Sequence, residues 1–124
     1  VLTVSNMNRT IDFYSKQLGM KLEEFSSDPN LGIRKCLKFG NQKINLHSVD
    51  MLLKGAHVAA PGTVDICFIS SRPIEEWIKQ FKKNSVEIEL GPTLQVGATS
   101  NLKSIYIRDP DRNLIEISNK IESE

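Results

Sequence analysis

The sequence has no apolar run long enough to span a bilayer, and no charged start followed by an apolar core that would mark a signal peptide. It also lacks an excess of charge of one sign, because 16 basic and 15 acidic residues are interspersed and leave a formal net charge of +1. Without a basic stripe, long-range attraction to nucleic acid or to an anionic membrane is not expected. We predict neither as a partner, and we predict a cytoplasmic location.

Cysteine is scarce. Cys36 and Cys67 both stand in apolar, strand-like runs, without the Cys-x-x-Cys spacing of a structural zinc site. Free cysteine behaves as a small, buried apolar residue, and cytosolic thiols stay reduced. We predict two buried free thiols, with a disulfide as the alternative.

The length and composition favour a single domain. Of the 124 residues, 40% are hydrophobic and 25% are charged, values close to those of soluble globular proteins, which argues against disorder, collagen and coiled coil. A chain of this size can bury a core but is small enough to favour association. We expect one domain, residues 1–124, that forms a homodimer.

The apolar patterns of the first half predict the order strand, helix and three strands. Ser5 or Asn6 would cap the helix, Gly19 would end it, and Gly40-Asn41 would form a hairpin turn. The predicted elements are a strand at 1–4, a helix at 7–18, and strands at 20–25, 34–39 and 42–49.

The second half repeats this order after a linker at about residues 51–62. Ser71 would cap its helix, and Pro73 would lie in the first turn. An apolar stripe at helical spacing, Ile74, Trp77, Ile78 and Phe81, would face the core. The predicted elements are a strand at 64–69, a helix at about 73–83, strands at 86–90, 103–108 and 114–118, and a loop at 91–102.

The two helices also match each other, since residues 10–18 and 73–81 place apolar, charged and Lys-Gln positions in step. A period of about 60 residues is longer than that of a solenoid and indicates two equivalent modules, although two amphipathic helices can agree by chance. We predict an α+β fold of two βαβββ modules, at about 1–50 and 63–122.

The segment 108–117 reads as a tight polar turn followed by a strand. Strand alternation places Glu116 on the face opposite to Ile115 and Ile117. A carboxylate among apolar neighbours is costly to bury unless a cation or hydrogen-bond donors compensate its charge. Glu116 is therefore exposed to solvent, bound to a metal, or catalytic.

The same alternation groups polar residues on one face of several strands. We expect these polar faces to line one cleft. The groups are Asn45 with His47, Asp65 with Cys67, Leu114 with Glu116 and Ser118, and Ser104 with Tyr106 and Arg108.

The paired modules, the segment TIDFYSKQLGM at 10–20 and the segment RDPDRNLIEI at 108–117 resemble the vicinal oxygen chelate superfamily. Its members include glyoxalase I, extradiol dioxygenases, fosfomycin-resistance enzymes and bleomycin-binding proteins. The segment FGNQKINLH at 39–47, with residues 56–57 and 61–62, looks more narrowly like glyoxalase domain-containing protein 5 and its bacterial relatives.

This resemblance implies two curved mixed sheets that face each other around a cleft holding a divalent metal. Glu116 matches the carboxylate ligand of the last strand, and Asp65 stands where many relatives carry a histidine ligand. A first-strand histidine ligand would lie just before Val1. Asn45 occupies the place of a further glutamate ligand of glyoxalase I. The implied ion is Fe, Mn, Ni or Zn.

The candidate metal ligands are thus Glu116 and Asp65, although Asp65 could instead bond local backbone amides at the start of its strand. His47 is the candidate catalytic base, because an ordinary histidine pKa near 6.5 suits proton transfer at neutral pH, or it is merely hydrogen-bonded. The candidate substrate-binding residues are Asn45, Tyr106 and Arg108. Tyr106 could instead pack in the core, and Arg108 could instead belong to a turn held by charge pairs.

Our leading hypothesis is a metal-dependent, glyoxalase- or dioxygenase-like enzyme acting on a small oxygen-rich substrate bound through vicinal oxygens, with the 91–102 loop closing over it. The principal alternative is a metal-free protein that sequesters a small molecule of the bleomycin type. Asp65 in place of histidine and Asn45 in place of glutamate favour this alternative. A third possibility is an interaction or regulatory domain.

Overall fold

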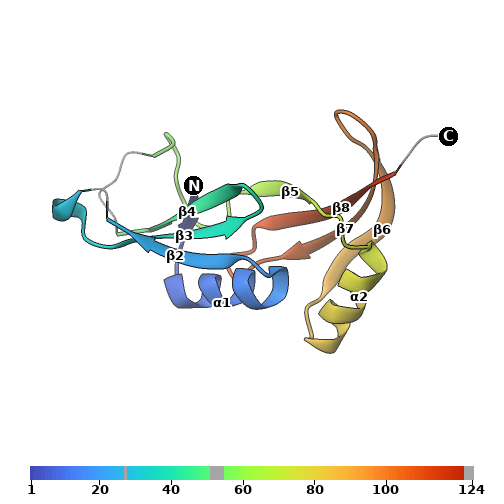
Figure 1. Ribbon diagram of the computed structural model, residues 1–124, viewed down its shortest axis with the longest axis horizontal. Coiled ribbons are helices and arrows are strands. Elements are labelled where there is room, and N and C mark those ends of the chain that lie inside the picture. The colour runs from blue at the N-terminus through green and yellow to red at the C-terminus, as the bar shows by residue number, and fades with distance from the viewer. Residues whose placement is uncertain (27, 51–54, 122–124) are drawn as a thin grey trace. The chain divides into compact units, whose positions relative to one another are not determined.

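Apolar residues at every second position of the strands build two four-stranded mixed sheets, each covered on one face by a helix (Figure 1). The computed structural model describes residues 1–26, 28–50 and 55–121. Contacts divide the chain into unit one, Val1–Val64 with Pro110–Arg112, and unit two, which is the remainder from Asp65. The α+β class and the βαβββ order of each half are confirmed. The single domain and the facing sheets stay predictions, and residues 51–54 of the expected linker lie outside the described residues.

Unit one contains a sheet in the strand order β1-β4-β3-β2, with β1 and β4 parallel. The helix α1 lies against β2 and β3 (Figure 1). Its core includes Val4, Tyr14, Leu37 and Leu46, each at most 1% exposed. The elements are β1 (Leu2–Val4), α1 (Met7–Leu18), β2 (Lys21–Phe25), a 3-10 turn (Pro29–Leu31), β3 (Arg34–Phe39) and β4 (Gln42–Ser48).

The predicted ends of α1 are confirmed at both termini. The Asn6 side chain accepts a hydrogen bond from the Arg9 backbone N–H at 3.0 Å, and Gly19 ends the helix in the left-handed region, with φ at 69°. Ser5, the other candidate cap, instead donates its backbone N–H and its hydroxyl to Asp111. A single amide side chain therefore starts the helix, while Ser5 ties its entry to the Pro110–Arg112 turn.

Unit two repeats the topology of unit one, because its sheet has the order β5-β8-β7-β6 with β5 and β8 parallel. The helix side is closed by side chains that are at most 2% exposed, among them Ile74, Phe81, Ile105 and Ile117. The elements are β5 (Asp65–Ile69), α2 (Ile74–Lys83), β6 (Ile88–Val96), β7 (Asn101–Arg108) and β8 (Leu114–Ile121). Neither described helix has the length and apolar character to cross a membrane.

The predicted loop at 91–102 is wrong, because β6 continues to Val96 and pairs with β7 along its length. The register shift between Leu90 and Thr93 absorbs Gly91 and Pro92, the residues that signalled a loop. Gly91 has φ at +112°, and a Cβ there would lie 2.5 Å from the Ser104 carbonyl oxygen, so only glycine fits. The segment expected to close over a ligand is reduced to a short turn after Val96.

The predicted capping of α2 by Ser71 is also wrong, because the helix begins at Ile74 and a residue from a distant strand caps it. The Asn119 Oδ1 atom accepts the Ile74 backbone N–H at 2.7 Å. Its Nδ2 group donates to the carbonyl oxygens of Ser70 and Arg72 at 2.9 and 2.8 Å. One amide on β8 thus satisfies three backbone groups before and at the start of α2.

Replacing Asn119 with alanine would leave these backbone groups without their partner in a half-buried setting. We expect Asn119→Ala to lower the free energy of unfolding by about 2 kcal/mol, as for the loss of a helix cap together with further hydrogen bonds. Denaturant unfolding followed by circular dichroism measures the change. Asn101→Ala, at an exposed asparagine that begins β7, is the matched control and should shift the free energy by less than about 0.5 kcal/mol. Equal effects of the two variants would contradict the capping role.

Candidate functional site

Each sheet has one face packed on its helix and one face lined by polar side chains. The first polar face, in unit one, is defined by Glu23 and Phe25 of β2, Arg34, Cys36 and Lys38 of β3, and Lys43, Asn45 and His47 of β4. The second polar face, in unit two, is defined by Asp65 and Cys67 of β5, Ser104, Tyr106 and Arg108 of β7, and Glu116 and Ser118 of β8.

Strand pairing on the second polar face brings the predicted metal ligands together. Cys67 pairs with Glu116, and Glu116 pairs with Tyr106 on its other side. Asp65 lies two residues from Cys67 on the same face and therefore diagonal to Glu116. The charges of Glu116 and Asp65 both act on the Tyr106 hydroxyl. The alternation seen in the sequence is therefore confirmed for these four residues.

Two serine hydroxyls fix the Glu116 carboxylate. Ser104 and Ser118 donate to its Oε2 atom at 2.6 and 3.0 Å. Both serines are fully buried, and their hydroxyl oxygens are 2.7 Å apart. The half-buried carboxylate is thus oriented and compensated by hydrogen-bond donors, which lowers the cost of keeping its charge. Strand alternation predicts both serines on polar faces but not their contact with Glu116, because that contact requires the pairing of Ser104 with Ser118 in the β7–β8 register.

Cys67 is exposed, so the prediction of two buried thiols is wrong for this residue, although both cysteines are free and Cys36 is buried. Alternation turns Ile66 and Phe68 toward the helix and Cys67 toward the polar face, where its Sγ atom lies 3.3 Å from the Ser118 hydroxyl. Desolvation is the largest cause that raises the pKa of the thiol, and the Glu116 charge adds to it. The thiol is therefore held in its protonated form.

Tyr106 is half-buried on the second polar face and does not belong to the core. Desolvation raises the pKa of its hydroxyl above the ordinary value, and the charge of Glu116 raises it further. The phenol is therefore a neutral hydrogen-bond donor near the carboxylate.

Arg108 is paired with an acid of the neighbouring strand. Its Nη2 atom lies 3.0 Å from an oxygen of Glu89, and its Nε atom donates to the same carboxylate at 3.1 Å. The adjoining turn is instead held by Asn113, which donates its backbone N–H and side-chain amide to Asp109 at 2.9 and 2.8 Å. An anionic substrate at Arg108 would have to compete with Glu89.

On the first polar face, His47 contacts a guanidinium group. The Arg34 Nη2 atom lies 3.2 Å from His47 Nε2, and a guanidinium can only donate, so Nε2 accepts and the ring is neutral with its proton on Nδ1. His47 is 8% exposed. Desolvation lowers its pKa, and the Arg34 charge lowers it further. His47 is thus neutral, as a base must be. The Nε2 lone pair that would take up a proton, however, already accepts a hydrogen bond from Arg34.

The candidate Asn45 and the second histidine of the chain, His57, differ in their surroundings. The Asn45 Oδ1 atom is buried and accepts no hydrogen bond from the described residues. His57, in the segment before β5, is exposed. The structure therefore leaves Asn45 as an unsatisfied acceptor beside His47 and gives His57 no defined place in a site.

The chain belongs to the glyoxalase/bleomycin resistance protein/dioxygenase superfamily, which it matches over residues 1–117. Virulence protein STM3117 of Salmonella typhimurium is 45% identical over 119 residues, which make up 95% of this chain and 79% of that protein. The crystal structure of STM3117 has a TM-score of 0.90 at 44% identity and covers 97% of this chain and 92% of its own.

Glyoxalase domain-containing protein RDO1 of Mycosarcoma maydis is 40% identical over 95% of this chain and 64% of its own length, so this chain spans less than two thirds of it. Two more distant structures share the fold alone. Lactoylglutathione lyase from Agrobacterium tumefaciens has a TM-score of 0.66 at 22% identity, over 95% of this chain and 88% of its own. The antibiotic-binding protein TnmS3 from Streptomyces sp. CB03234 has a TM-score of 0.71 at 17% identity, over 97% of this chain and 91% of its own. The narrower likeness to glyoxalase domain-containing protein 5 stays a prediction.

The contact between Arg34 and His47 predicts a pH dependence. We expect the His47 ring to titrate below the ordinary value of about 6.5 in an NMR titration, and Arg34→Gln to raise its pKa because the neighbouring positive charge is removed. His57→Gln identifies the signal, since the chain has two histidines. A His47 pKa that is unchanged by Arg34→Gln would contradict the contact.

The same lowered pKa affects stability. Because the folded state favours neutral His47, the unfolded chain binds the proton first as the pH falls below about 6.5. The contribution of His47 to the free energy of unfolding is complete above that pH and decreases below it, until the pKa of the folded state is reached. Between pH 7 and pH 5, the free energy of unfolding should therefore fall less in His47→Gln than in the wild type.

Proposed function

We propose that the protein is an enzyme that uses a divalent metal to act on a small oxygen-rich molecule bound through vicinal oxygens, as a glyoxalase-type lyase or a dioxygenase would. The observation that carries this proposal is the orientation of Glu116 by Ser104 and Ser118 on the second polar face. Hydrogen-bonding partners that orient a ligating side chain are typical of metal sites. Membership of the superfamily supports the proposal, and so does the fold shared with a lactoylglutathione lyase.

The donor atoms fit a divalent ion in kind but supply only part of a coordination shell. Glu116 and Asp65 offer carboxylate oxygens from neighbouring strands. The two serines donate to Oε2 of Glu116, so Oε1 is the oxygen that would bind the ion. Within residues 1–26, 28–50 and 55–121, no three His, Cys, Asp or Glu side chains gather into a metal cluster. Water and substrate oxygens would therefore complete the shell, as in sites built on one or two carboxylates.

The metal, when bound, would act as a Lewis acid on the substrate oxygens. Tyr106 remains protonated because its pKa is raised, so its hydroxyl would donate a hydrogen bond to a substrate oxygen. Ser104 and Ser118 would keep Glu116 in place while the substrate exchanges. The second polar face would thus bind and orient an oxygen-rich group.

His47 and Asn45 carry the part of the proposal that falls in unit one. His47 could take a proton at Nε2 only after its hydrogen bond with Arg34 breaks. Until then this bond holds the imidazole ring in place, so we assign Arg34 a positioning role. The Asn45 amide, whose oxygen has no partner among the described residues, would bind a hydroxyl or amide donor of the substrate. A homodimer, a cytoplasmic location and a place in the glyoxalase domain-containing protein 5 subgroup belong to the same proposal.

Metal analysis of protein purified without chelator tests the metal ligand directly. We expect about one Fe, Mn, Ni or Zn per chain, and a loss of at least tenfold in metal affinity for Glu116→Gln, because an amide oxygen lacks the charge of the carboxylate. Glu87→Gln, at an exposed glutamate between α2 and β6, is the matched control and should retain the metal.

The serine contacts give a graded form of this test. Ser104→Ala and Ser118→Ala should each weaken metal binding by about 10- to 100-fold, as the loss of an orienting partner does. Retention of the metal in Glu116→Gln would exclude Glu116 as a ligand. A wild-type protein without metal at neutral pH would exclude the enzyme proposed here.

The second candidate is a metal-free protein that sequesters a small molecule of the bleomycin type. The specific observation in its favour is that both serine hydroxyls already compensate the Glu116 charge, while Asp65 takes the place of a histidine ligand. The fold shared with an antibiotic-binding protein agrees with this function. Calorimetry with bleomycin distinguishes it, because sequestration predicts the same affinity before and after treatment of the protein with EDTA.

A further inference from the structure

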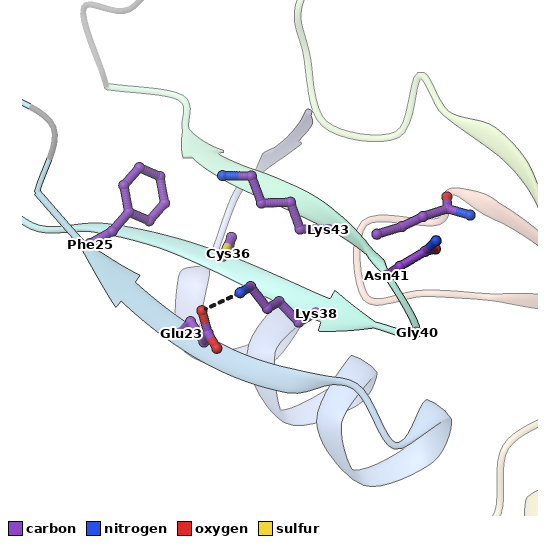
Figure 2. Close-up of a pocket in the computed structure, with 8 residues that line it drawn as sticks. Glu23, Phe25, Cys36, Lys38, Gly40, Asn41 and Lys43 are labelled. Atoms are coloured by element: carbon purple, nitrogen blue, oxygen red, sulfur yellow. Dashed lines mark ion pairs between the residues drawn. The ribbon is translucent and has the colours of Figure 1, made fainter.

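The first polar face contains a hollow at its hairpin end that the proposed function does not use (Figure 2). Its volume of about 430 Å³ is within the ~300 to 1,000 Å³ of small-molecule sites. The lining residues belong to three strands and one turn. They are Glu23 and Phe25 of β2, Cys36 and Lys38 of β3, Gly40, Asn41 and Gln42 at the turn, and Lys43 of β4.

The charges in this hollow do not balance. Glu23 is its one acidic lining residue, and it is paired with Lys38, whose Nζ atom lies 2.9 Å from the carboxylate. This pairing raises the pKa of Lys38, chiefly through the hydrogen bond. Lys43 makes no ion pair with the described carboxylates, and its Nζ atom lies 4.7 Å from the centre of the Phe25 ring. The lining therefore carries one positive charge more than negative charge.

A second cation adds to this excess. The Arg34 guanidinium carbon lies 5.0 Å from the centre of the same Phe25 ring, so one aromatic side chain contacts two positive groups. A cation over an aromatic face at an exposed site is held more weakly than one in a charge-assisted hydrogen bond. Lys43 can therefore exchange the ring for an anionic oxygen.

The shape of the hollow complements its charge. Lys38 and Lys43 pair directly across β3 and β4 near the hairpin turn. Figure 2 shows the Phe25 ring at the end of the hollow away from Gly40, with Cys36 between this ring and Lys38. Cys36 is 2% exposed and forms an apolar floor. Once Lys43 exchanges the ring for an anionic oxygen, Phe25 offers a flat wall on which a planar group can stack. A matching ligand has a negative oxygen group at one end and a flat apolar part at the other.

We infer that this hollow binds a small organic anion, with its carboxylate or phosphate at Lys43 and its flat group against Phe25. The site goes beyond the proposed function, because all its residues belong to unit one and none is a candidate metal ligand. It gives the protein a second recognition element, which is selective for the charge of a small molecule.

Titrations of the full chain, followed by NMR through the backbone amides of Cys36 and Lys43, test the site with three probes. Benzoate carries both features of the ligand, benzamide is its neutral counterpart, and inorganic phosphate lacks the flat group. We expect benzoate to cause saturating chemical-shift changes at these amides, and we expect its affinity to fall as salt is added. Benzamide should bind about tenfold more weakly or worse. Equal binding of benzamide and benzoate would overturn the anion site.

Matched variants locate the binding. Lys43→Gln should lower the affinity for benzoate about tenfold, whereas Lys120→Gln, at an exposed lysine of β8, should leave this affinity unchanged. Phe25→Leu should weaken benzoate and spare inorganic phosphate. Equal effects of the two lysine variants, or no shifts with any probe, would overturn the inference.

The metal is tested separately. Glu116→Gln should bind benzoate like the wild type, because Glu116 does not line the hollow. Loss of the metal with benzoate binding retained would support the anion site. Loss of benzoate binding in Glu116→Gln would overturn the assignment of the site to unit one alone.

Discussion

The parallel pairing of the first and last strands of each unit is the constraint on which the polar faces depend. Parallel neighbours cannot be joined by a tight turn and need a long crossover. In unit two, α2, β6 and β7 provide that crossover, and it returns β8 alongside β5. Cys67 consequently lies beside Glu116, although the two are far apart in the sequence. Any change that shifted this pairing by one residue would turn Glu116 toward the helix and Ile117 toward the polar face.

Where the structural signal is local, the sequence predicts the fold in detail. The approximate bounds predicted for α1 are confirmed, because Asn6 and Gly19 act within one turn of the helix ends. The start of α2 is not predicted, because its cap, Asn119, arrives from the last strand of the sheet. The β6 strand is mispredicted because Gly91 and Pro92 have the same local signature in a loop as in a bulged strand. The pairing with β7 decides between the two.

The candidate site divides in the same way. Alternation alone predicts that Glu116, Asp65 and Tyr106 share a face, and the pairing confirms this. The serines that hold Glu116 and the guanidinium that holds His47 could not be found by alternation, because side chains on neighbouring strands meet only once the register is known. The burial of Cys67 is mispredicted because apolar residues surround it in the sequence, whereas strand alternation turns its side chain to the polar face. That these groups form one catalytic site stays a prediction.

The two units have the same topology but different chemistry on their polar faces. Their helix-facing sides are both apolar, as at Leu37 in unit one and Ile117 in unit two, because close packing against a helix tolerates little else. A polar face makes no such demand and is free to differ. The first polar face places Arg34 and Lys43 over an aromatic ring, whereas the second places a carboxylate among hydroxyl groups and a thiol.

These differences matter more for function than the shared fold does. A face with excess positive charge attracts anionic groups, and a face with an oriented carboxylate attracts metal ions or hydrogen-bond donors. The superfamily therefore defines the scaffold, while the charge on each face defines what it can bind. Because Glu116 is already compensated by Ser104 and Ser118, a ligand on the second face must offer more than these two hydroxyls, and a divalent ion does so through its charge.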